Sequence, residues 1–378
     1  MKKIVSLLIC VLLTIPLLTL NVSALSEDEI SAPSAVLIDA DSGKILFEKN
    51  KDEQRPCASI TKVMTLLLVM EALDSGKIHL EDVVTTSAHA ASMGGSDIWL
   101  EEGEQMTVDE MIKATAVASA NDAAVALAEH ICGSEDDFVV MMNEKAKALG
   151  MEQTTFLNCN GLDEEGHLTS AYDVALMSKE LIRHNKIFDY TNIWLDSLRG
   201  GETQIVNTNK LLKTYPGITG LKTGTTGEAG SCISATAQRD GLSLVAVVLG
   251  APSGKERFAD AAALLDYGFA NFMTVKLDMS EELYPMTVDG GMENEVAIVC
   301  EDSAAVTVPK GEEGNVKQTL ELSESIAAPV EKGQKVGTLS YTLGGETVAS
   351  FDVVTADSVE AMSFLTVLTN LYQAAVKL

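Results

Sequence analysis

The chain has 378 residues, of which 46% are hydrophobic and 5% aromatic. This length and composition are typical of a folded protein with about two domains, and they exclude a chain that is disordered throughout. The formal net charge is −28. Because so acidic a surface repels phosphate backbones and anionic lipids, the charge argues against nucleic-acid binding and against charge-driven attachment to a membrane.

The N-terminal residues are typical of a secretory signal peptide. Two lysines precede a largely apolar stretch over residues 4–20, and small residues stand at Val22 and Ala24. We therefore predict a signal peptide over residues 1–24, cleaved after Ala24, and a mature chain that is secreted or otherwise extracytoplasmic. The alternative is a retained transmembrane anchor, for which the apolar stretch is slightly short and contains Pro16.

Two β-hairpins are predicted in the mature chain. Residues 35–39 and 44–48 flank the turn sequence Asp-Ser-Gly, and residues 231–237 and 242–250 flank Gln-Arg-Asp-Gly. Since hairpins pair antiparallel strands, we expect an antiparallel sheet rather than a doubly wound parallel one.

The segment between the two hairpins is predicted to be mostly helical. Apolar residues recur at helical spacing over residues 107–130 and 170–184, and Ser170 with Asp173 would form a capping box in the second segment. A further helix is predicted over residues 257–272. The expected fold of residues 25–274 is therefore α/β (α+β), with helices covering an antiparallel sheet and a helical lobe beside it.

The C-terminal third of the chain has a different pattern. Short strand-like runs separated by glycine-containing turns predict a small all-β domain over residues 275–356. Residues 357–378 are predicted to form an amphipathic helix, which could lie on a membrane surface, although it lacks a basic face, or dock on this protein or a partner. The apolar face of this helix carries Met362, Leu365, Leu368, Tyr372 and Ala375.

Five cysteines follow the predicted signal peptide, and none forms a Cys-x-x-Cys pair. Zinc binding is therefore not expected. Because the number is odd, at least one thiol stays outside a disulfide in a monomer, and we interpret most of them as small buried residues. They are Cys57, Cys132, Cys159, Cys232 and Cys300.

The stretch CASITKVMTLLLVMEAL, residues 57–73, places Ser59 three residues before Lys62 at the start of an apolar helix. An ordinary lysine has a pKa of about 10.4, and removing its proton at pH 7 costs about 4.6 kcal/mol. Burial lowers a lysine pKa by up to about 3–5 units, and a second cation nearby acts in the same direction. A lysine at i+3 shares the serine's face of the helix and could deprotonate its hydroxyl. The alternative is a lysine that simply reaches water, because this spacing is common by chance.

Two further motifs could serve such a pair. Ser119-Ala-Asn121 interrupts a run of small apolar residues, where Asn121 or Asp122, taken alone, would be interpreted as a helix N-cap. Lys222-Thr-Gly224 lies in a glycine-rich stretch, and a glycine-bearing sheet edge lets a substrate backbone approach closely. Taken alone, this second motif would be interpreted as a solvated turn.

Together the three motifs, in the order SxxK, SxN and KTG, resemble those of the penicillin-recognising serine enzymes. Longer stretches, DADSGKILFEKN, RPCASITKVMT, NGLDEEGHLTSAYDVA and YPGITGLKTGTTGEAG, resemble the low-molecular-weight penicillin-binding proteins, the secreted D-alanyl-D-alanine carboxypeptidases. The resemblance spans residues 32–272. The β-rich domain and the terminal helix are also similar to that family's architecture.

The resemblance implies a chemical role for each motif. Ser59 would be the nucleophile that forms an acyl-enzyme, and Lys62 would be the base for its attack. Ser119 would relay a proton to the leaving amine, while Asn121 would hold the substrate amide and orient Lys62. The backbone N–H groups of Ser59 and Thr225 would form the oxyanion hole.

The resemblance also implies how substrate is bound. Lys222, with Thr223 and Thr225, would hold the terminal carboxylate, and Arg257 would support it. The implied substrate is a peptidoglycan stem pentapeptide ending in D-Ala-D-Ala, β-lactam antibiotics would acylate the same serine, and no metal or organic cofactor is required. The implied substrate-binding residues are Asn121, Lys222, Thr223, Gly224, Thr225 and Arg257.

Other functions stay open at this point. A class A β-lactamase uses a glutamate for deacylation, and Glu164 and Glu165 lie near the right region. A transpeptidase or endopeptidase would act on related wall peptides, and a wall-binding or β-lactam-sensing protein would be acylated without turnover. A Ser-His-Asp hydrolase would need a Gly-x-Ser-x-Gly sequence, which the chain lacks, and we interpret His167 as capping or orienting the helix after it. Cys57 would make the site sensitive to thiol reagents if it were exposed, but a buried structural thiol is expected.

Overall fold

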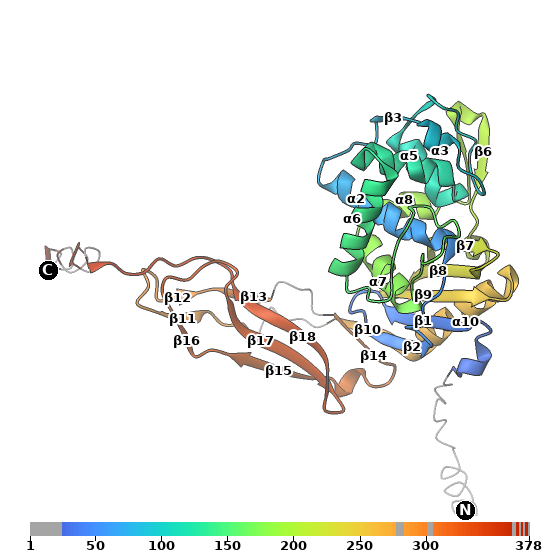
Figure 1. Ribbon diagram of the computed structural model, residues 1–378. Coiled ribbons are helices and arrows are strands. Elements are labelled where there is room, and N and C mark those ends of the chain that lie inside the picture. The colour runs from blue at the N-terminus through green and yellow to red at the C-terminus, as the bar shows by residue number, and fades with distance from the viewer. Residues whose placement is uncertain are drawn as a thin grey trace, which may run out of the picture.

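The computed structural model describes residues 25–276, 283–300, 305–364, 368–369, 372 and 375–376. The predicted signal peptide, residues 1–24, lies outside the described residues. Figure 1 shows a mixed lobe of helices and strands, from which a β-rich arm extends toward the C-terminus. Among the helices of the described residues, none is both long and apolar enough to cross a membrane.

A five-stranded antiparallel sheet forms the centre of the lobe. Across the sheet its strands are β2 (Ile45–Lys49), β1 (Ser34–Asp39), β9 (Leu242–Ala251), β8 (Gly230–Arg239) and β7 (Ile218–Thr226). Both predicted hairpins are confirmed, and Asp240 and Gly241 in the second have φ angles of +50° and +83°, as its tight turn requires. The edge strand β7, which carries the KTG sequence, faces the helical part of the lobe (Figure 1).

Alternating side chains along β9 belong to different hydrophobic cores on the two faces of the sheet. Val245 and Val247 pack in the core that contains helices α2 (Lys62–Asp74) and α7 (Ala171–Leu181). Leu244 and Val248 pack in the core beneath α10 (Gly254–Asn271). This is the two-residue period of a strand covered on both faces. The helix predicted over residues 257–272 is thus confirmed as α10.

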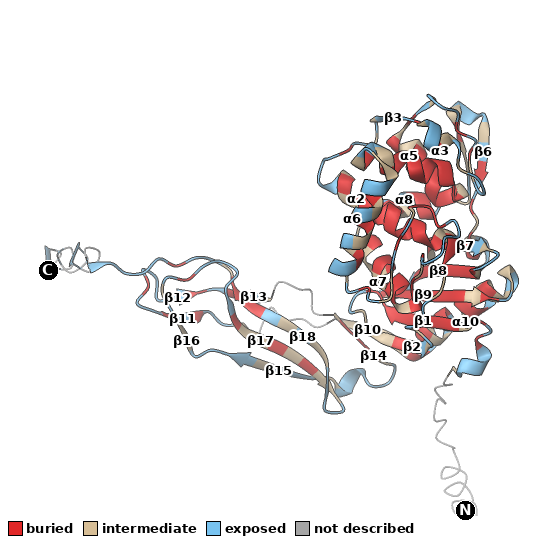
Figure 2. Cartoon of the chain, in the orientation of Figure 1, coloured by how far each residue is buried: buried red, intermediate tan, exposed pale blue. Residues whose placement is uncertain are grey.

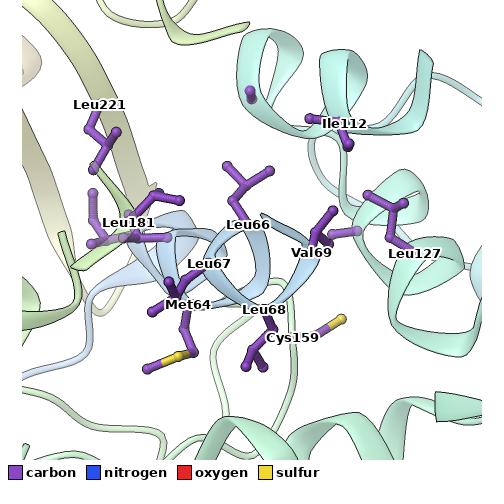
Figure 3. Close-up of a cluster of buried hydrophobic side chains, with 14 of the residues drawn as sticks. Met64, Leu66, Leu67, Leu68, Val69, Ile112, Leu127, Cys159, Leu181 and Leu221 are labelled. Carbon is purple, nitrogen blue, oxygen red and sulfur yellow. The ribbon is translucent and has the colours of Figure 1, made fainter. Parts of the chain in front are cut away.

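The helical part of the lobe packs around α2, whose residues 63–70 are all buried. Figure 3 shows the side chains of α2 at the centre of this core, between Leu181 on one side and Ile112 and Leu127 on the other. A helix that is apolar on every side is surrounded by protein. Lys62, its first residue, is therefore also withdrawn from water. The helices around it include α4 (Val108–Lys113), α5 (Asn121–Cys132) and α6 (Glu135–Ala148).

The single helix predicted over residues 107–130 is broken in the structure. Helix α4 runs into a π-helical turn, η3 (Ala114–Ala118), and the chain then adopts left-handed backbone at Ser119, with φ +64°. Such a conformation is costly for a residue with a side chain and often marks a functional site. Apolar spacing alone could not locate the break, because α4 and α5 belong to the same core on either side of it.

Only half of the predicted capping box at α7 forms. The Asp173 N–H donates to Ser170 Oγ at 3.1 Å, as expected for an N-cap. The Asp173 carboxylate instead accepts hydrogen bonds from the Gln153 N–H and the Thr154 hydroxyl, both within 2.8 Å. The predicted return bond is wrong because the carboxylate ties α7 to the preceding loop.

The remaining elements of the lobe are short. Two two-stranded sheets, β3 (Val83–Thr85) with β4 (Gln105–Thr107) and β5 (Leu195–Leu198) with β6 (Thr203–Val206), lie at its periphery. The other short helices are α3 (Ala88–Ala91), α8 (Phe188–Thr191), α9 (Leu211–Thr214), η1 (Glu27–Glu29), η2 (Ala58–Thr61), η4 (Asn185–Ile187) and η5 (Arg199–Gly201).

The β-rich arm confirms the predicted all-β architecture after the lobe. It contains β11 (Met286–Asp289), β12 (Glu295–Val296) and β16 (Ser325–Ala327) in one sheet, and β13 (Ile298–Cys300), β18 (Glu346–Thr355), β17 (Lys335–Leu343) and β15 (Lys317–Leu322) in another. Strand β10 (Phe272–Lys276) pairs with β14 (Ala305–Pro309), before the short turn η6 (Glu313–Asn315). The predicted boundary between residues 274 and 275 falls inside β10, and the division into domains stays a prediction. Figure 2 shows that buried residues dominate the lobe, whereas β15 is largely exposed.

The C-terminal helix begins later than predicted. Residues 359 and 361 form isolated β-bridges with the arm, so the start of the 357–378 segment is extended rather than helical. Helical residues are described from Phe364 onward, and Leu365 of the predicted apolar face lies outside the described residues. The exposed large apolar side chains described here are Met362, Phe364, Leu368, Tyr372 and Val376.

Candidate active site

Ser59 lies in the 3₁₀ turn η2, and Lys62 is the first residue of α2. In a 3₁₀ turn residues i and i+3 are nearly eclipsed, so the two side chains emerge on the same side. The Lys62 Nζ and Ser59 Oγ atoms are 3.1 Å apart, within hydrogen-bond distance. The predicted juxtaposition of hydroxyl and amine is therefore present, although it is made by a 3₁₀ turn rather than by α-helix.

Lys62 is fully buried. Burial lowers the pKa of its amine to about 7, against the opposing influence of Cys159 and Asp122. Nζ also contacts Asn121 Oδ1 and the main-chain oxygen of Asn160, each at 2.5 Å.

These contacts suit the neutral form of the amine. A neutral amine has two N–H groups and one lone pair. If Asn121 and Asn160 accept the two N–H groups, the lone pair is left to accept the Ser59 hydroxyl proton. The arrangement can therefore perform general-base activation of an alcohol.

The SxN and KTG motifs meet in the structure. Lys222 is 1% exposed, and its Nζ donates to Ser119 Oγ at 2.8 Å and to the Thr223 main-chain oxygen at 2.9 Å. Burial lowers the pKa of Lys222 well below its ordinary value, and the positive charges of Lys62 and Arg257 act in the same direction. The left-handed backbone at Ser119 thus places a hydroxyl against a buried amine.

Asn121 joins the base to the opposite wall of the site. Besides accepting from Lys62, it donates through Nδ2 to the Gly94 oxygen at 2.6 Å, and its N–H donates to the Ser96 oxygen at 2.7 Å. Helix α5 begins at Asn121, and its N-cap residue is Ala120. The alternative that Asn121 is simply an N-cap is therefore wrong.

Gly224 lets β7 lie directly on the turn that carries the nucleophile. A Cβ atom built at this residue would stand 2.6 Å from the Cys57 oxygen and 3.0 Å from the Ser59 nitrogen. No larger residue fits without moving backbone. The strand edge and the Ser59 amide are therefore in contact, as the expected oxyanion hole requires.

The threonines of β7 have different partners. Arg257, on α10, donates through one guanidinium nitrogen to Thr225 Oγ1 and to the Gly224 oxygen, each at 2.9 Å. Thr223 Oγ1 donates instead to the Thr208 hydroxyl at 2.6 Å. Arg257 and Thr225 are thus brought together as predicted, while the Thr223 hydroxyl already has a protein partner.

His167 braces the turn before α2. The Leu157 N–H donates to His167 Nδ1 at 3.1 Å, so Nε2 carries the proton and donates to Thr61 Oγ1 at 2.8 Å. Thr61 in turn donates to the Ala58 oxygen at 2.9 Å, and burial lowers the pKa of His167 to about 4. The prediction of a structural role is confirmed, but the turn that His167 holds is η2, not the helix that follows it.

Two other sequence alternatives are answered by burial. The Cys57 thiol is buried, and this burial raises its pKa to about 12, which leaves it unreactive. Glu164 and Glu165 are both exposed, and Glu164 accepts from Asn158 Nδ2 at 3.2 Å.

Several residues of the site were not predicted from the sequence. The Asn160 contact uses a main-chain oxygen, which no side-chain pattern can indicate. Glu135 accepts the neighbouring Cys159 N–H at 2.9 Å, and Thr208 pairs with Thr223. Asp122 accepts from the main chain of a distant loop, and its place beside Asn121 in the SxN helix was the only available signal. Among the described residues, no three His, Cys, Asp or Glu side chains converge as a metal site.

Comparison with known proteins agrees with this geometry. Residues 21–253 match the family model of the D-alanyl-D-alanine carboxypeptidases, peptidase S11, and residues 272–361 match that of the penicillin-binding protein 5 C-terminal domain. The chain is 44% identical over 381 residues to the D-alanyl-D-alanine carboxypeptidase DacF of Bacillus subtilis, covering 97% of each chain. It is 35% identical over 353 residues to DacC of Escherichia coli, covering 90% of this chain and 88% of DacC.

Solved structures give the same result. Penicillin-binding protein 5 from Haemophilus influenzae has a TM-score of 0.79 at 34% identity, covering 89% of this chain and all of that one. Penicillin-binding protein D2 from Listeria monocytogenes, in an ampicillin-bound form, has a TM-score of 0.59 at 33% identity, covering 64% of this chain and 98% of that one. The predicted fold class and resemblance are confirmed, and the chain belongs to the D-alanyl-D-alanine carboxypeptidase family, peptidase S11.

Proposed function

We propose that this chain performs its family's reaction on peptidoglycan stem pentapeptides, with Ser59 as the nucleophile. The enzyme removes the terminal D-alanine through an acyl-enzyme, and β-lactams acylate the same serine. The observation that carries this assignment is the contact of Ser59 with a buried amine whose pKa is lowered to about 7. Such a group is a competent base near neutral pH, where an ordinary lysine is not.

Acylation begins when Lys62 accepts the Ser59 proton. Ser59 Oγ then attacks the carbonyl carbon between the two D-alanines, and the carbonyl oxygen becomes an oxyanion. The N–H groups of Ser59 and Thr225 stabilise this charge, a contribution of about 2.7–4 kcal/mol of barrier for each donor. The close approach of Gly224 to the Ser59 amide supports this pairing of donors.

Departure of D-alanine requires a proton on its amine. Ser119 supplies it, because its hydroxyl bridges Lys222 and the space next to the reacting serine. Lys62, now protonated, is the source of that proton through the site's hydrogen bonds. Water then hydrolyses the ester and restores Ser59.

Selectivity for a free C-terminus follows from uncompensated positive charge. Lys222 and Arg257 are both largely buried, and each has its pKa lowered, first by burial. A bound carboxylate relieves this destabilisation, because an opposite charge favours both cationic forms. Thr225, held by Arg257, provides a hydroxyl at the same place.

The place of action follows from the substrate. Peptidoglycan lies outside the cytoplasm, so the mature chain is exported, and residues 1–24 serve as its signal peptide. The catalytic domain covers residues 25–274, the β-rich domain 275–356, and the C-terminal segment 357–378 attaches the enzyme to the membrane surface. Its exposed Phe364, Leu368 and Tyr372 support attachment, while docking on a partner would use the same side chains. Fractionation of the mature protein with and without residues 357–378 decides between them.

Replacement of the nucleophile tests the reaction. Ser59→Ala abolishes D-alanine release from a pentapeptide and labelling by fluorescent penicillin. Ser92→Ala, at an exposed serine, is the matched control and keeps both. Persistent labelling of the Ser59→Ala protein would remove the assignment.

Product analysis separates the rival activities. Slow release of the penicilloyl group favours a carboxypeptidase over a β-lactamase. Cleavage or formation of cross-links in muropeptides would indicate an endopeptidase or transpeptidase. Labelling by penicillin without release of D-alanine would indicate a sensor.

A further inference from the structure

Trp99 is the most exposed tryptophan side chain a chain of this kind could present beside its active site, at 78% of full exposure. It lies in residues 94–100, which we call the 94–100 loop. Single exposed apolar residues are common and need no explanation by themselves. The arrangement of this loop is different, because its neighbours on both sides are fixed.

Ile98 and Leu100, which flank Trp99, are both buried, and their N–H groups donate to the Asp122 carboxylate at 3.0–3.2 Å. Trp99 itself has left-handed backbone, with φ +56°. Two buried anchors and one carboxylate thus hold the loop while the indole points outward. The ring is displayed on rigid backbone and does not need to be ordered when a ligand binds.

The same loop is part of the active-site wall. The oxygens of Gly94 and Ser96 accept hydrogen bonds from Asn121, which also contacts Lys62. Three residues separate Ser96 from Trp99, so their Cα atoms lie within about 10 Å of each other. Trp99 is therefore close enough to meet the part of a bound peptide just outside the D-Ala-D-Ala site.

The charges beside the ring select the sign of its ligand. Asp97, Glu101 and Glu102 flank Trp99, and within the described part of the chain none of the three forms an ion pair. Burial, and then the negative charge of Asp122, raise the pKa of Asp97. An anionic group would be repelled here, whereas an amine is attracted both by carboxylates and by the face of an indole.

We infer that Trp99 forms a subsite for the side chain of the residue that precedes D-Ala-D-Ala in the stem peptide. In stem peptides that residue is a diamino acid, with an alkyl chain that ends in a primary amine. The alkyl chain lies on the indole, and the ammonium is held over the ring beside the acidic residues. This inference rests on the proposed function, because it assumes that the D-Ala-D-Ala end binds at Ser59.

Two peptides that differ only in charge test the subsite. Nα-acetyl-L-Lys-D-Ala-D-Ala keeps the amine, and Nα,Nε-diacetyl-L-Lys-D-Ala-D-Ala removes its charge on the same chain. Trp99→Leu lowers kcat/KM for D-alanine release from the free amine about three- to tenfold, mainly through KM, and changes the diacetyl peptide less than about twofold. Trp99→Phe retains an aromatic face and most of the preference.

The controls separate this inference from the proposed function. Fluorescent penicillin has no diamino side chain, so it acylates the wild-type, Trp99→Leu and Trp99→Phe proteins at the same rate. If the wild-type protein were not acylated, the proposed function would fail first. With acylation intact, equal losses for both peptides, or no loss in Trp99→Leu, overturn the subsite. A loss that occurs only when a disaccharide is attached to the peptide would place a sugar on the ring and overturn it as well.

Discussion

Lys222 donates a hydrogen bond to Ser119 across 2.8 Å, and this bond joins two motifs that lie 103 residues apart in the sequence. Ser119 comes from the break between two helices, whereas Lys222 comes from the edge strand of the sheet. The active site is therefore assembled at the contact between the helical part of the lobe and the sheet. Each prediction below perturbs one part of that contact.

Removing the charge of Lys222 weakens substrate binding and proton relay together. Lys222→Met deletes a buried partner of the substrate carboxylate and the donor to Ser119. Charged hydrogen bonds contribute about 1.5–3 kcal/mol, so kcat/KM for D-alanine release falls about 10- to 100-fold. Lys77→Met, at an exposed lysine, leaves it unchanged. Undiminished activity in Lys222→Met would show that this amine does not hold the carboxylate.

The pH dependence of acylation reports the protonation of Lys62. The base is the neutral amine, so activity is present above its pKa and lost as pH falls through it. With a pKa of about 7, the second-order rate of penicillin acylation falls about tenfold per pH unit below 7 and is flat above it. Stopped-flow labelling between pH 5 and 9 measures this. A rate that stays constant over that range would exclude Lys62 as the base.

Gly224 is required for the contact between β7 and the nucleophile turn. Gly224→Ala puts a methyl group 2.6 Å from the Cys57 main-chain oxygen, so the strand must shift and its oxyanion donor with it. We expect penicillin acylation to slow at least about tenfold, because small misplacements of reacting groups are costly. Gly227→Ala meets no atom within 4 Å and is the matched control. Equal rates in the two variants would contradict this packing.

His167 makes the fold sensitive to acid. Its pKa is about 4 in the folded chain and about 6.5 when unfolded, so the unfolded state takes up the proton first. The associated stability is complete above pH 6.5 and is lost as pH falls toward 4, by about 3 kcal/mol. Urea unfolding at several pH values measures it. His167→Gln has no group to titrate, and its unfolding free energy therefore falls less steeply than that of the wild type over this interval; parallel curves would refute the assignment.

Local features of the fold were predictable from the sequence. The hairpin around Asp240 and Gly241 follows from turn residues between apolar runs, and α10 follows from apolar spacing. The Ser59–Lys62 contact was predictable because it spans a single turn. The meeting of Ser119 with Lys222 is a long-range contact that spacing does not encode, and there the family resemblance supplied the expectation.

Other features could not be predicted, for identifiable physical reasons. The break at Ser119 is invisible to periodicity because the flanking segments pack into one core. The Asn160 oxygen that holds Lys62 belongs to the main chain, which every residue has. Asp173 was available for a capping box, but a tertiary partner, the loop at Gln153, took its carboxylate. In each case tertiary packing decided between locally equivalent options.

The central claim is that Ser59 forms the covalent acyl-enzyme, and its most direct test is mass spectrometry of the protein after reaction with penicillin. The account predicts one penicilloyl group per chain, located by proteolytic mapping on Ser59 within the CASITK sequence. An adduct on Ser119 or on any other residue, or a protein of unchanged mass under conditions where the fold is intact, would contradict it.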